Sequence, residues 1–295
     1  MLHTGQLEKR VYKAYAHLKR CDLCANYCGV DRLVSTLGAV CHTGRQAKVF
    51  TYGAHHGEEN PLRGWNGSGT IFFSWCNLQC EFCQNWEISH KGIGEEASPE
   101  RLAEMMLELQ AQGCHNINFV SPSHVVAQII EAVFIAAKKG LRLPLVYNTG
   151  GYDSLEALKM LKDIIDIYMP DVKFADSMTA QRLTHVKSYV EVNRAAVLEM
   201  HRQVGDLVLD SYGVAQRGLL LRHLVMPGKL VETERVLFFV ANSISTNTYV
   251  NLMDQYHPCY RTDEFQGVDK RLPEKDFRDA VLLARHFGLS RLDRT

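Results

Sequence analysis

Cysteine is the residue type in this sequence whose number and spacing point most directly to chemistry. Seven of the nine cysteines fall into two tight groups, one of four and one of three: Cys21, Cys24, Cys28, Cys41 and Cys76, Cys80, Cys83. A reducing compartment does not preserve structural disulfides, so grouped thiols in a chain expected to stay in the cytoplasm predict metal or iron–sulfur ligands. Cys114 and Cys259 stand alone, and we interpret Cys114 as a small buried apolar residue.

The second group has the spacing Cys76-x3-Cys80-x2-Cys83 and follows an apolar run at 71–74 that predicts a strand. It therefore occupies the loop at the carboxyl end of that strand, where β/α barrels place their chemistry. Three thiolates ligate three irons of a cubane and leave the fourth iron open, whereas closed structural sites use four protein ligands. The alternative is a zinc site completed by a distant His or Cys. Placement and spacing favour a reactive [4Fe–4S] cluster on these three cysteines.

The first group supplies four thiolates, from Cys21-x2-Cys24-x3-Cys28 and, after twelve further residues, Cys41. Four thiolates complete either a tetrahedral zinc site or a second iron–sulfur cluster, and the spacing does not separate the two. His42, beside Cys41, is an alternative ligand. An auxiliary cluster would relay electrons or hold substrate, whereas zinc would brace the N-terminal part of the chain.

Short apolar runs alternate with helical segments from about residue 70 onward. The runs predict strands at 71–74, 116–120, 144–148, 165–169, 219–225 and 248–252. Helices are predicted at 98–112, 123–139, 154–163, 231–242 and 273–288. Ser98 and Pro99 are a typical cap and first residue of a helix, and Gly113 is a typical end. Such alternation implies parallel strands with right-handed crossovers. We therefore predict an α/β fold, a partial (β/α)6 barrel with a small N-terminal cysteine-rich metal-binding element.

This interpretation divides the chain into a cysteine-rich element at 1–65, a core at 66–260 and a closing segment with a helix at 261–295. The stretch 175–210 fits no single strand–helix unit, because a long helical stretch and a short apolar run share it. The stretch 52–65 contains several groups that could bind metal or substrate: His55, His56, Glu58 and Glu59. Its charge, glycines and proline are typical of a solvated loop, which is the structure we predict for it.

The overall composition narrows the classes of partner. Lysine and arginine (33) balance aspartate and glutamate (33), so no strong field favours nucleic acid or an anionic membrane. Hydrophobic residues make up 46% of the chain and charged residues 22%, which is ordinary for a globular protein. No apolar run approaches the length of a bilayer-spanning helix, and the first residues lack an apolar signal-peptide core. We expect a cytoplasmic protein that binds neither nucleic acid nor membrane.

The cysteine triplet, with the aromatic Phe82 directly before its last member, resembles the signature of radical S-adenosylmethionine (SAM) enzymes. The similarity extends over about 66–260. The neighbouring motifs resemble the pyruvate formate-lyase activating-enzyme branch, in particular its uncharacterised relatives with an extra N-terminal cysteine group. The resemblance implies that the open iron binds the amino and carboxylate groups of SAM and that Phe82 lies against the adenine. It also implies reductive cleavage of SAM to methionine and a 5′-deoxyadenosyl radical, which abstracts a hydrogen atom.

Polar residues at further strand ends extend the resemblance, which implies that they lie near SAM. They are Ser121 and Ser123 after the second strand, Asn148 after the third, Asp171 and Lys173 after the fourth, Arg222 in the fifth, and His257 after the sixth. Lys173 would anchor the methionine carboxylate as a point charge. Asp171 and Lys173 could also form a simple salt bridge, since they alternate on one side of an extended segment.

Other interpretations of these residues also stay open. Ser121 and Asn148 are residue types that commonly form turns. Arg222 and His223 point to opposite faces of a regular strand, so at most one of them faces the lumen. His257 precedes a proline in what could be an ordinary loop, and only the resemblance marks it as a SAM contact.

Three functions are compatible with these observations. The first is a radical SAM oxidoreductase that abstracts hydrogen from a substrate, for which the activase resemblance implies a backbone glycine of a partner protein. The second is radical modification of a peptide or small metabolite, a chemistry in which auxiliary cysteine clusters are often found. The third is an iron–sulfur scaffold or redox sensor without turnover, against which the open triplet and the Asp171/Lys173 pair argue. For the enzymes we expect a flavodoxin- or ferredoxin-like electron donor.

Overall fold

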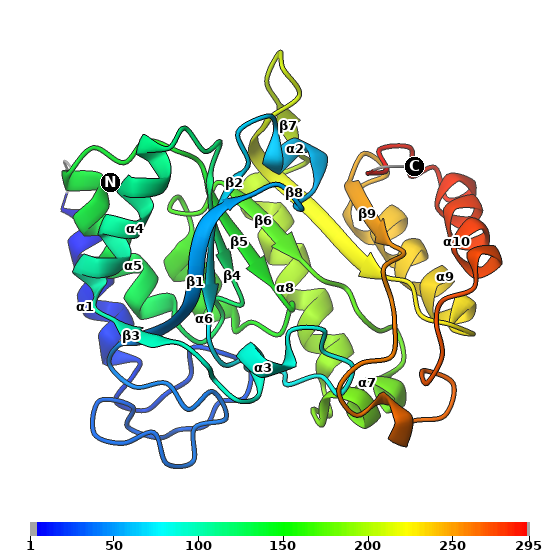
Figure 1. The fold of residues 1–295 in the computed structure, drawn as a ribbon, viewed down its shortest axis with the longest axis horizontal. Helices are drawn as coiled ribbons and strands as arrows, with labels where there is room; N and C mark the ends of the chain where they lie inside the picture. Colours follow the sequence, from blue (N-terminus) through cyan, green and yellow to red (C-terminus); the bar gives the residue numbers. More distant parts are fainter. Residues whose placement is uncertain (1–4, 294–295) are drawn as a thin grey trace.

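A nine-stranded sheet forms the centre of the computed structural model, which describes residues 5–293 (Figure 1). The strand order is β3-β1-β2-β4-β5-β6-β8-β7, and β9 also pairs with β8. Six strands are parallel and follow one another in chain order: β2 (Ser68–Phe73), β4 (Ile117–Val120), β5 (Leu145–Thr149), β6 (Ile167–Pro170), β8 (Ala215–Leu224) and β9 (Tyr249–Met253). Each matches one of the six predicted runs, which confirms the α/β class and the largely parallel sheet.

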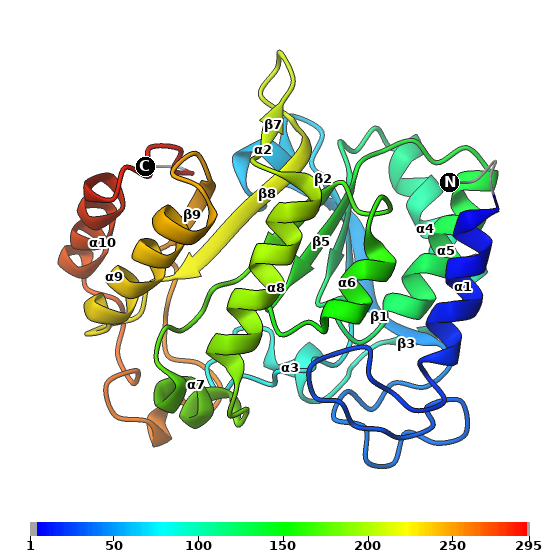
Figure 2. The ribbon, with the colours of Figure 1, turned by 180° about the vertical axis from the view of Figure 1, so that it is seen from behind.

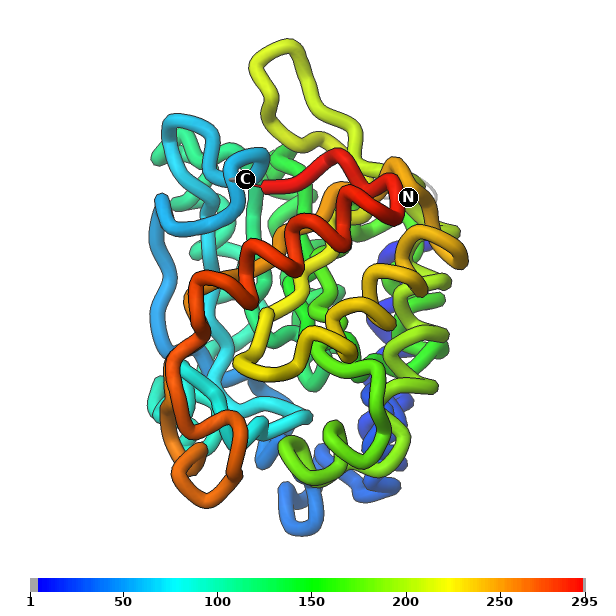
Figure 3. Tube along the Cα trace, turned by 90° about the vertical axis from the view of Figure 1, so that its right-hand side faces the viewer, coloured from blue at the N-terminus to red at the C-terminus, as the bar shows by residue number. Residues whose placement is uncertain are grey.

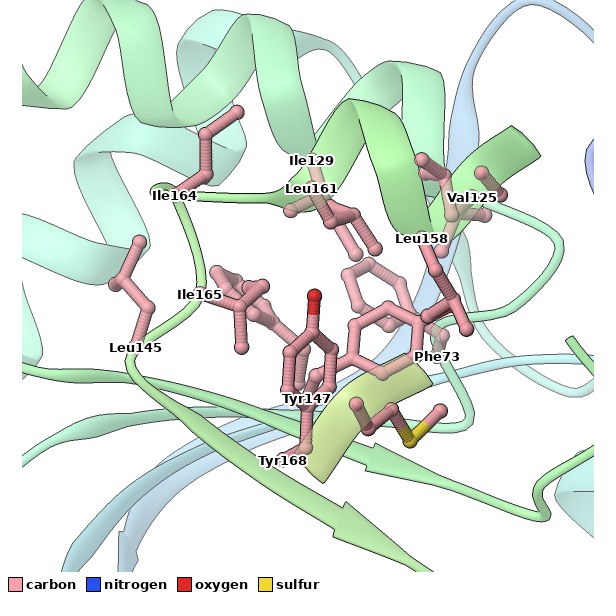
Figure 4. Packing of buried hydrophobic residues seen from close by; sticks show 14 of the residues in the cluster. Phe73, Val125, Ile129, Leu145, Tyr147, Leu158, Leu161, Ile164, Ile165 and Tyr168 are labelled. Carbon is pink, nitrogen blue, oxygen red and sulfur yellow. The ribbon is translucent and has the colours of Figure 1, made fainter. Parts of the chain in front are cut away.

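Helices cover the outer face of the parallel strands (Figure 2): α4 (Pro99–Ala111), α5 (Val126–Lys138), α6 (Leu155–Leu161), α8 (Tyr189–Val204) and α9 (Leu230–Phe239). Side-chain oxygens of Ser98 and Ser154 cap α4 and α6, each accepting a backbone N–H at 3.2 Å. The sheet is covered on both faces where it carries the core, and every residue of β5 is buried. Figure 4 shows Tyr147 and Tyr168 of β5 and β6 packed among apolar side chains such as Leu158.

The stretch 175–210 contains three elements, α7 (Ser177–Thr184), α8 and β7 (Val208–Leu209). α8 is the crossover helix between β6 and β8, so the repeating unit persists here. β7 pairs antiparallel with the start of β8 in a hairpin that projects from the end of the molecule opposite α7 (Figure 1). The sequence pattern was obscured because α7 and β7 are inserted within the β6–α8–β8 unit, one before α8 and one after it.

The N-terminal part differs from the prediction of a separate element at 1–65. α1 (Gln6–Ala16) packs against α5, β1 (Ala47–His55) pairs antiparallel with β2, and β3 (Glu95–Ala97) pairs with β1. The end of the predicted element therefore belongs to the sheet. β1 shows little apolar periodicity because most of its residues are half-buried or exposed. Residues 17–46 form irregular loops at the carboxyl end of the parallel strands (Figure 1).

The chain closes with α10 (Glu274–His286), the predicted C-terminal helix, which packs against α9 (Figure 3). After α10 the backbone returns to β9, where Val250 N–H donates to Arg291 O at 2.9 Å and Asp293 N–H donates to Val250 O at 3.0 Å. The remaining elements are short: α2 (Asn60–Arg63), α3 (Trp86–Ser89), the π-helical turn η1 (Val240–Ile244) and the 3-10 turn η2 (Thr262–Glu264). Among the described helices, none combines the length and apolar character needed to cross a bilayer.

Candidate active site

The loop after β2 carries the cysteine triplet to the carboxyl end of the parallel strands. Cys76, Cys80 and Cys83 line one cavity of about 160 Å³. Five further residues singled out from the sequence line the same cavity: Ser121, Asn148, Asp171, Lys173 and Arg222. They come from four different strands or strand ends, which meet here because parallel strands finish at the same edge of the sheet.

The backbone around this cavity adopts conformations that L-residues rarely use. Trp75, Gln79 and Ser121 have φ of 68°, 50° and 58°, in the left-handed region. Gly151, after β5, has φ 76°, and a Cβ on it would lie 2.6 Å from the carbonyl oxygen of Asp171. Only glycine therefore lets the β5 loop approach the end of β6 this closely. Unusual backbone of this kind clusters at functional sites.

The surroundings of the three thiols suit thiolate ligands. Leu78 N–H lies 3.4 Å from Cys76 Sγ, and the Ser89 hydroxyl lies 3.2 Å from Cys83 Sγ. Burial raises the pKa of the Cys80 and Cys83 thiols, so metal binding is what would ionise them at neutral pH. Hydrogen bonds to ligating sulfur stabilise the thiolate and tune a cluster. This donor set fits an iron–sulfur cluster with one open iron.

Asp171 is the centre of a charged network in the cavity. It accepts hydrogen bonds from Lys173 Nζ and, at 2.8 Å, from Arg222 Nε. Arg222 Nη2 donates in turn to Asn148 Oδ1 at 2.8 Å. Burial opposes the ionisation of Asp171, but the two cations outweigh it and hold its pKa below the ordinary value. Burial also opposes the charge on Lys173, yet Asp171 raises the pKa of that amine. The salt bridge that was one interpretation of the pair is present, and it lines the cavity.

Arg222 and His223 point to opposite sides of β8, as the strand period predicts. Arg222 lines the cavity, whereas His223 Nδ1 lies 2.6 Å from Val172 O and its Nε2 lies 3.0 Å from Thr233 Oγ1. Burial lowers the pKa of His223 to about 4, so its ring is neutral at physiological pH. His223 therefore supports the strand and only Arg222 faces the site.

Three other residues singled out from the sequence do not line this cavity. Phe82 is buried against Phe174, with ring centroids 5.9 Å apart. Ser123 is buried, and its hydroxyl lies 2.9 Å from the hydroxyl of Thr149. His257 is exposed beyond the end of β9. Their contacts with SAM stay predictions.

A larger cavity of about 750 Å³ adjoins the first one. The two cavities share five lining residues: Phe72, Asn85, Val120, Asn148 and Arg222. Four acidic residues also line the larger cavity: Glu58, Glu59, Asp254 and Asp293. A molecule in the larger cavity would therefore lie against the same wall as a molecule beside the cysteine triplet.

The stretch 52–65 is not the solvated loop that its composition predicted. Glu58 and Glu59 are 7% and 4% exposed. Asn251 Nδ2 donates to Glu59 Oε1 at 2.9 Å, and Arg222 Nη1 lies 3.7 Å from the same oxygen. The proline and leucine of α2 are buried, so this short helix is anchored in the core and draws the preceding acids inward. The usable signal in the sequence is a pair of acids directly before Asn60 and Pro61, which form the first turn of a helix.

The N-terminal cysteine group lies beside the loop of the triplet. Asn26 Nδ2 donates to Asn77 O at 2.7 Å, and Gln79 Nε2 donates to Val40 O at 3.2 Å. Three of its cysteines are buried, and Cys28 is half-buried. Within residues 5–293, no three His, Cys, Asp or Glu side chains converge on a point that would hold a single metal ion.

A buried guanidinium lies within the N-terminal group. Arg32 is 2% exposed; its Nη1 lies 3.5 Å from Cys21 Sγ, its Nε donates to Thr43 O at 2.6 Å and its Nη2 donates to His124 O at 2.8 Å. In the described part of the chain no carboxylate forms an ion pair with it. Buried charges need a compensating charge, which thiolates would supply here. Burial raises the pKa of the Cys24 thiol to about 12, so ionisation in this group also depends on a bound metal.

Comparison with known proteins gives one family and several similar chains. A family model described as the radical SAM superfamily matches residues 70–216, a span that includes the cysteine triplet and the strand ends up to Lys173. The uncharacterised protein MJ0674 of Methanocaldococcus jannaschii is 30% identical over 292 residues, which cover 96% of this chain and 79% of that protein.

Two solved structures share the fold at 16% sequence identity. One is HydG, a maturase of the [FeFe]-hydrogenase, with a TM-score of 0.52, and the other is methylornithine synthase (PylB), with a TM-score of 0.50. Each match covers 76% of this chain. The chain spans 50% of the length of HydG and 63% of the length of PylB. At this identity the likeness concerns the fold alone.

Proposed function

The chain belongs to the radical SAM superfamily, and from that premise we propose that it is an oxidoreductase that uses a [4Fe–4S] cluster on Cys76, Cys80 and Cys83. Membership of the superfamily implies cleavage of SAM to a radical. The observation that carries the assignment to these cysteines is geometric. The three thiols share one cavity with five polar or charged residues that come from four neighbouring strands or strand ends.

Cys76, Cys80 and Cys83 would hold the cluster, which would supply the electron for the reductive cleavage of SAM to methionine and a radical that abstracts hydrogen from the substrate. The residues of this chain bind and orient SAM. Lys173 and Arg222 bring two positive charges to the cavity lining against one negative charge from Asp171, and this excess favours the methionine carboxylate. Asn148 accepts from Arg222 through its carbonyl oxygen and keeps its amide N–H groups for SAM.

Apolar side chains complete the lining of the cluster cavity: Phe72, Phe73, Leu78, Ile88 and Val120. They exclude water from the site and so strengthen the electrostatic contacts of the charged residues. The same exclusion protects a reactive radical from side reactions. A flavodoxin- or ferredoxin-like protein is the electron donor in this proposal.

The larger cavity supports a small metabolite or a peptide side chain as the substrate. Its volume of about 750 Å³ lies within the range of roughly 300–1,000 Å³ that small-ligand sites occupy. It meets the cluster cavity at Asn148 and Arg222, next to the expected position of SAM. The activase-like alternative, a backbone glycine of a partner protein, rests on the resemblance of the sequence motifs.

The EPR spectrum of the anaerobically reconstituted and reduced protein tests the proposal. SAM should change the spectrum of the reduced cluster, because SAM binds the iron that the three cysteines leave open. Cys80→Ala should lose this SAM-dependent change. Cys259→Ala is the matched control, since Cys259 is half-buried and lines neither cavity, and it should behave as the wild type does. A wild-type spectrum that does not respond to SAM would contradict the proposed function.

A further inference from the structure

The larger cavity has a charge pattern that SAM cleavage does not require. Its charged lining consists of four carboxylates and two basic groups: Glu58, Glu59, Asp254, Asp293, His55 and Arg222. Both basic groups already face carboxylates, since Arg222 Nε lies 2.8 Å from Asp171 Oδ1 and His55 Nδ1 lies 3.4 Å from Glu58 Oε1. The lining therefore carries an excess of negative charge, which repels anionic ligands and attracts cations.

Glu59 is one of the buried acids in this lining. Its side chain is 4% exposed, and its Oε1 accepts from Asn251 Nδ2 at 2.9 Å. Its Oε2 is buried and has no hydrogen-bond partner among residues 5–293. A buried carboxylate oxygen without a donor is costly, and native proteins satisfy nearly all such atoms. An N–H group of a ligand in the cavity would supply a donor to this oxygen.

The ionisation of Glu59 supports the same conclusion. Burial raises the pKa of this carboxyl group, and the neighbouring carboxylate of Glu58 adds to the rise even though Arg222 opposes it. A cation beside the two carboxylates would offset the repulsion between them. An N–H donor that also carries positive charge meets both needs of the site at once.

We propose that the larger cavity binds the substrate, a small molecule with an ammonium or guanidinium group that Glu58 and Glu59 hold. The proposal rests on the proposed function, because the cavity is a substrate site only if SAM is cleaved beside it. With the cation at the acidic pair, the rest of the molecule faces the wall shared with the cluster cavity, at Phe72, Val120 and Asn148. One C–H bond of the substrate breaks there, and its hydrogen atom forms a C–H bond with the 5′ carbon of the deoxyadenosyl radical. The products are 5′-deoxyadenosine and a substrate radical.

The lining favours a free small amine over the side chain of a folded partner. Phe277 of α10 and Asp293 of the C-terminal segment line the cavity, so the end of the chain forms part of its wall. The Asn60 N–H and the Tyr249 hydroxyl both donate to Asp293 Oδ1, at 3.2 and 2.8 Å, which ties α2 to β9 around the cavity. A cavity whose wall includes α2, β9 and α10 suits a ligand of metabolite size.

Calorimetric titration of the reconstituted holoprotein with pentylamine tests the proposal, with 1-pentanol and pentanoate as neutral and anionic probes of similar size. Pentylamine should bind, and the other two should not. Glu59→Gln keeps the shape of the side chain and should weaken amine binding about tenfold or more, because a charged hydrogen bond is lost. Glu58→Gln should weaken it as well. Glu100→Gln removes an exposed acid from α4 and should leave the titration unchanged.

Each other outcome overturns the proposal. Equal binding of amine by wild type and Glu59→Gln, or binding of pentanoate, removes the acidic pair as the recognition element. Competition between pentylamine and saturating SAM would assign the acids to the SAM site. Binding of an acetylated Gly-Lys-Gly amide without binding of pentylamine would replace the small amine by a peptide. The proposed function fails separately, if the same preparation binds the amine but forms no 5′-deoxyadenosine from SAM with dithionite.

Discussion

Asp171 holds two cations at once, and this determines what each of them offers to a ligand. Arg222 is committed to Asp171, Asn148 and Glu59, so most of its donors are occupied. Lys173 has three N–H donors, and the hydrogen bond to Asp171 accounts for one of them. Its raised pKa keeps the amine charged at neutral pH. Lys173 is therefore the residue we expect to anchor the methionine carboxylate of SAM.

Lys173→Met should weaken SAM binding by about 1.5–3 kcal/mol, roughly 10- to 150-fold in Kd, because a charge-assisted hydrogen bond is lost. The iron content should not change, since the three thiols remain. Lys187→Met, at an exposed position on the loop before α8, is the control for removing a lysine charge. Equilibrium binding of SAM and iron analysis on the same samples measure both quantities. Unchanged SAM affinity, or loss of iron together with SAM, would contradict this role.

At the scale of elements, the sequence predicts the strands and helices that have a local signal. It misses structure that depends on contacts between residues far apart in the chain. The six parallel strands were predictable because buried strands are continuous apolar runs between clear helix caps. β1 was not, since few of its residues are fully buried. The acids before α2 looked like a loop because their environment comes from Asn251, which lies 192 positions along the chain from Glu59. The contact of Phe82 with SAM is a prediction from its motif, whereas the contact between Phe82 and Phe174 cannot be read from spacing.

The loops at 17–46 lead to a prediction about the N-terminal cysteine group. Arg32→Met should lower the free energy of unfolding by about 3 kcal/mol, because it leaves the carbonyl oxygens of Thr43 and His124 without their donor. It should also lower the metal content of the protein, since the thiolates lose their buried countercharge. Arg20→Met, at an exposed position, should change neither. Denaturant unfolding and elemental analysis are the measurements. Full metal content with wild-type stability in Arg32→Met would refute this account of the group.

At the scale of the whole molecule, the cluster cavity and the two cysteine groups lie at the carboxyl ends of the parallel strands. The larger cavity extends from there toward the amino ends, where His55 pairs with Ser68, the first residue of β2. The cluster cavity and the larger cavity share a wall of five residues, and the N-terminal loops contact the loop of the triplet directly. SAM in the cluster cavity and a substrate in the larger cavity would thus lie on either side of this shared wall. The common edge at which the parallel strands end was predictable from the sequence. The paths of the loops that cross this edge were not.

The most direct test of the central claim is the formation of 5′-deoxyadenosine from SAM by the reconstituted protein under dithionite and without oxygen. The account predicts that the wild type produces it and that Cys76→Ala, Cys80→Ala and Cys83→Ala each produce none above background. Cys114→Ala, which removes a buried thiol outside both cavities, should retain production where the variant folds. Production of 5′-deoxyadenosine at the wild-type rate by a variant that lacks all three cysteines would contradict the account.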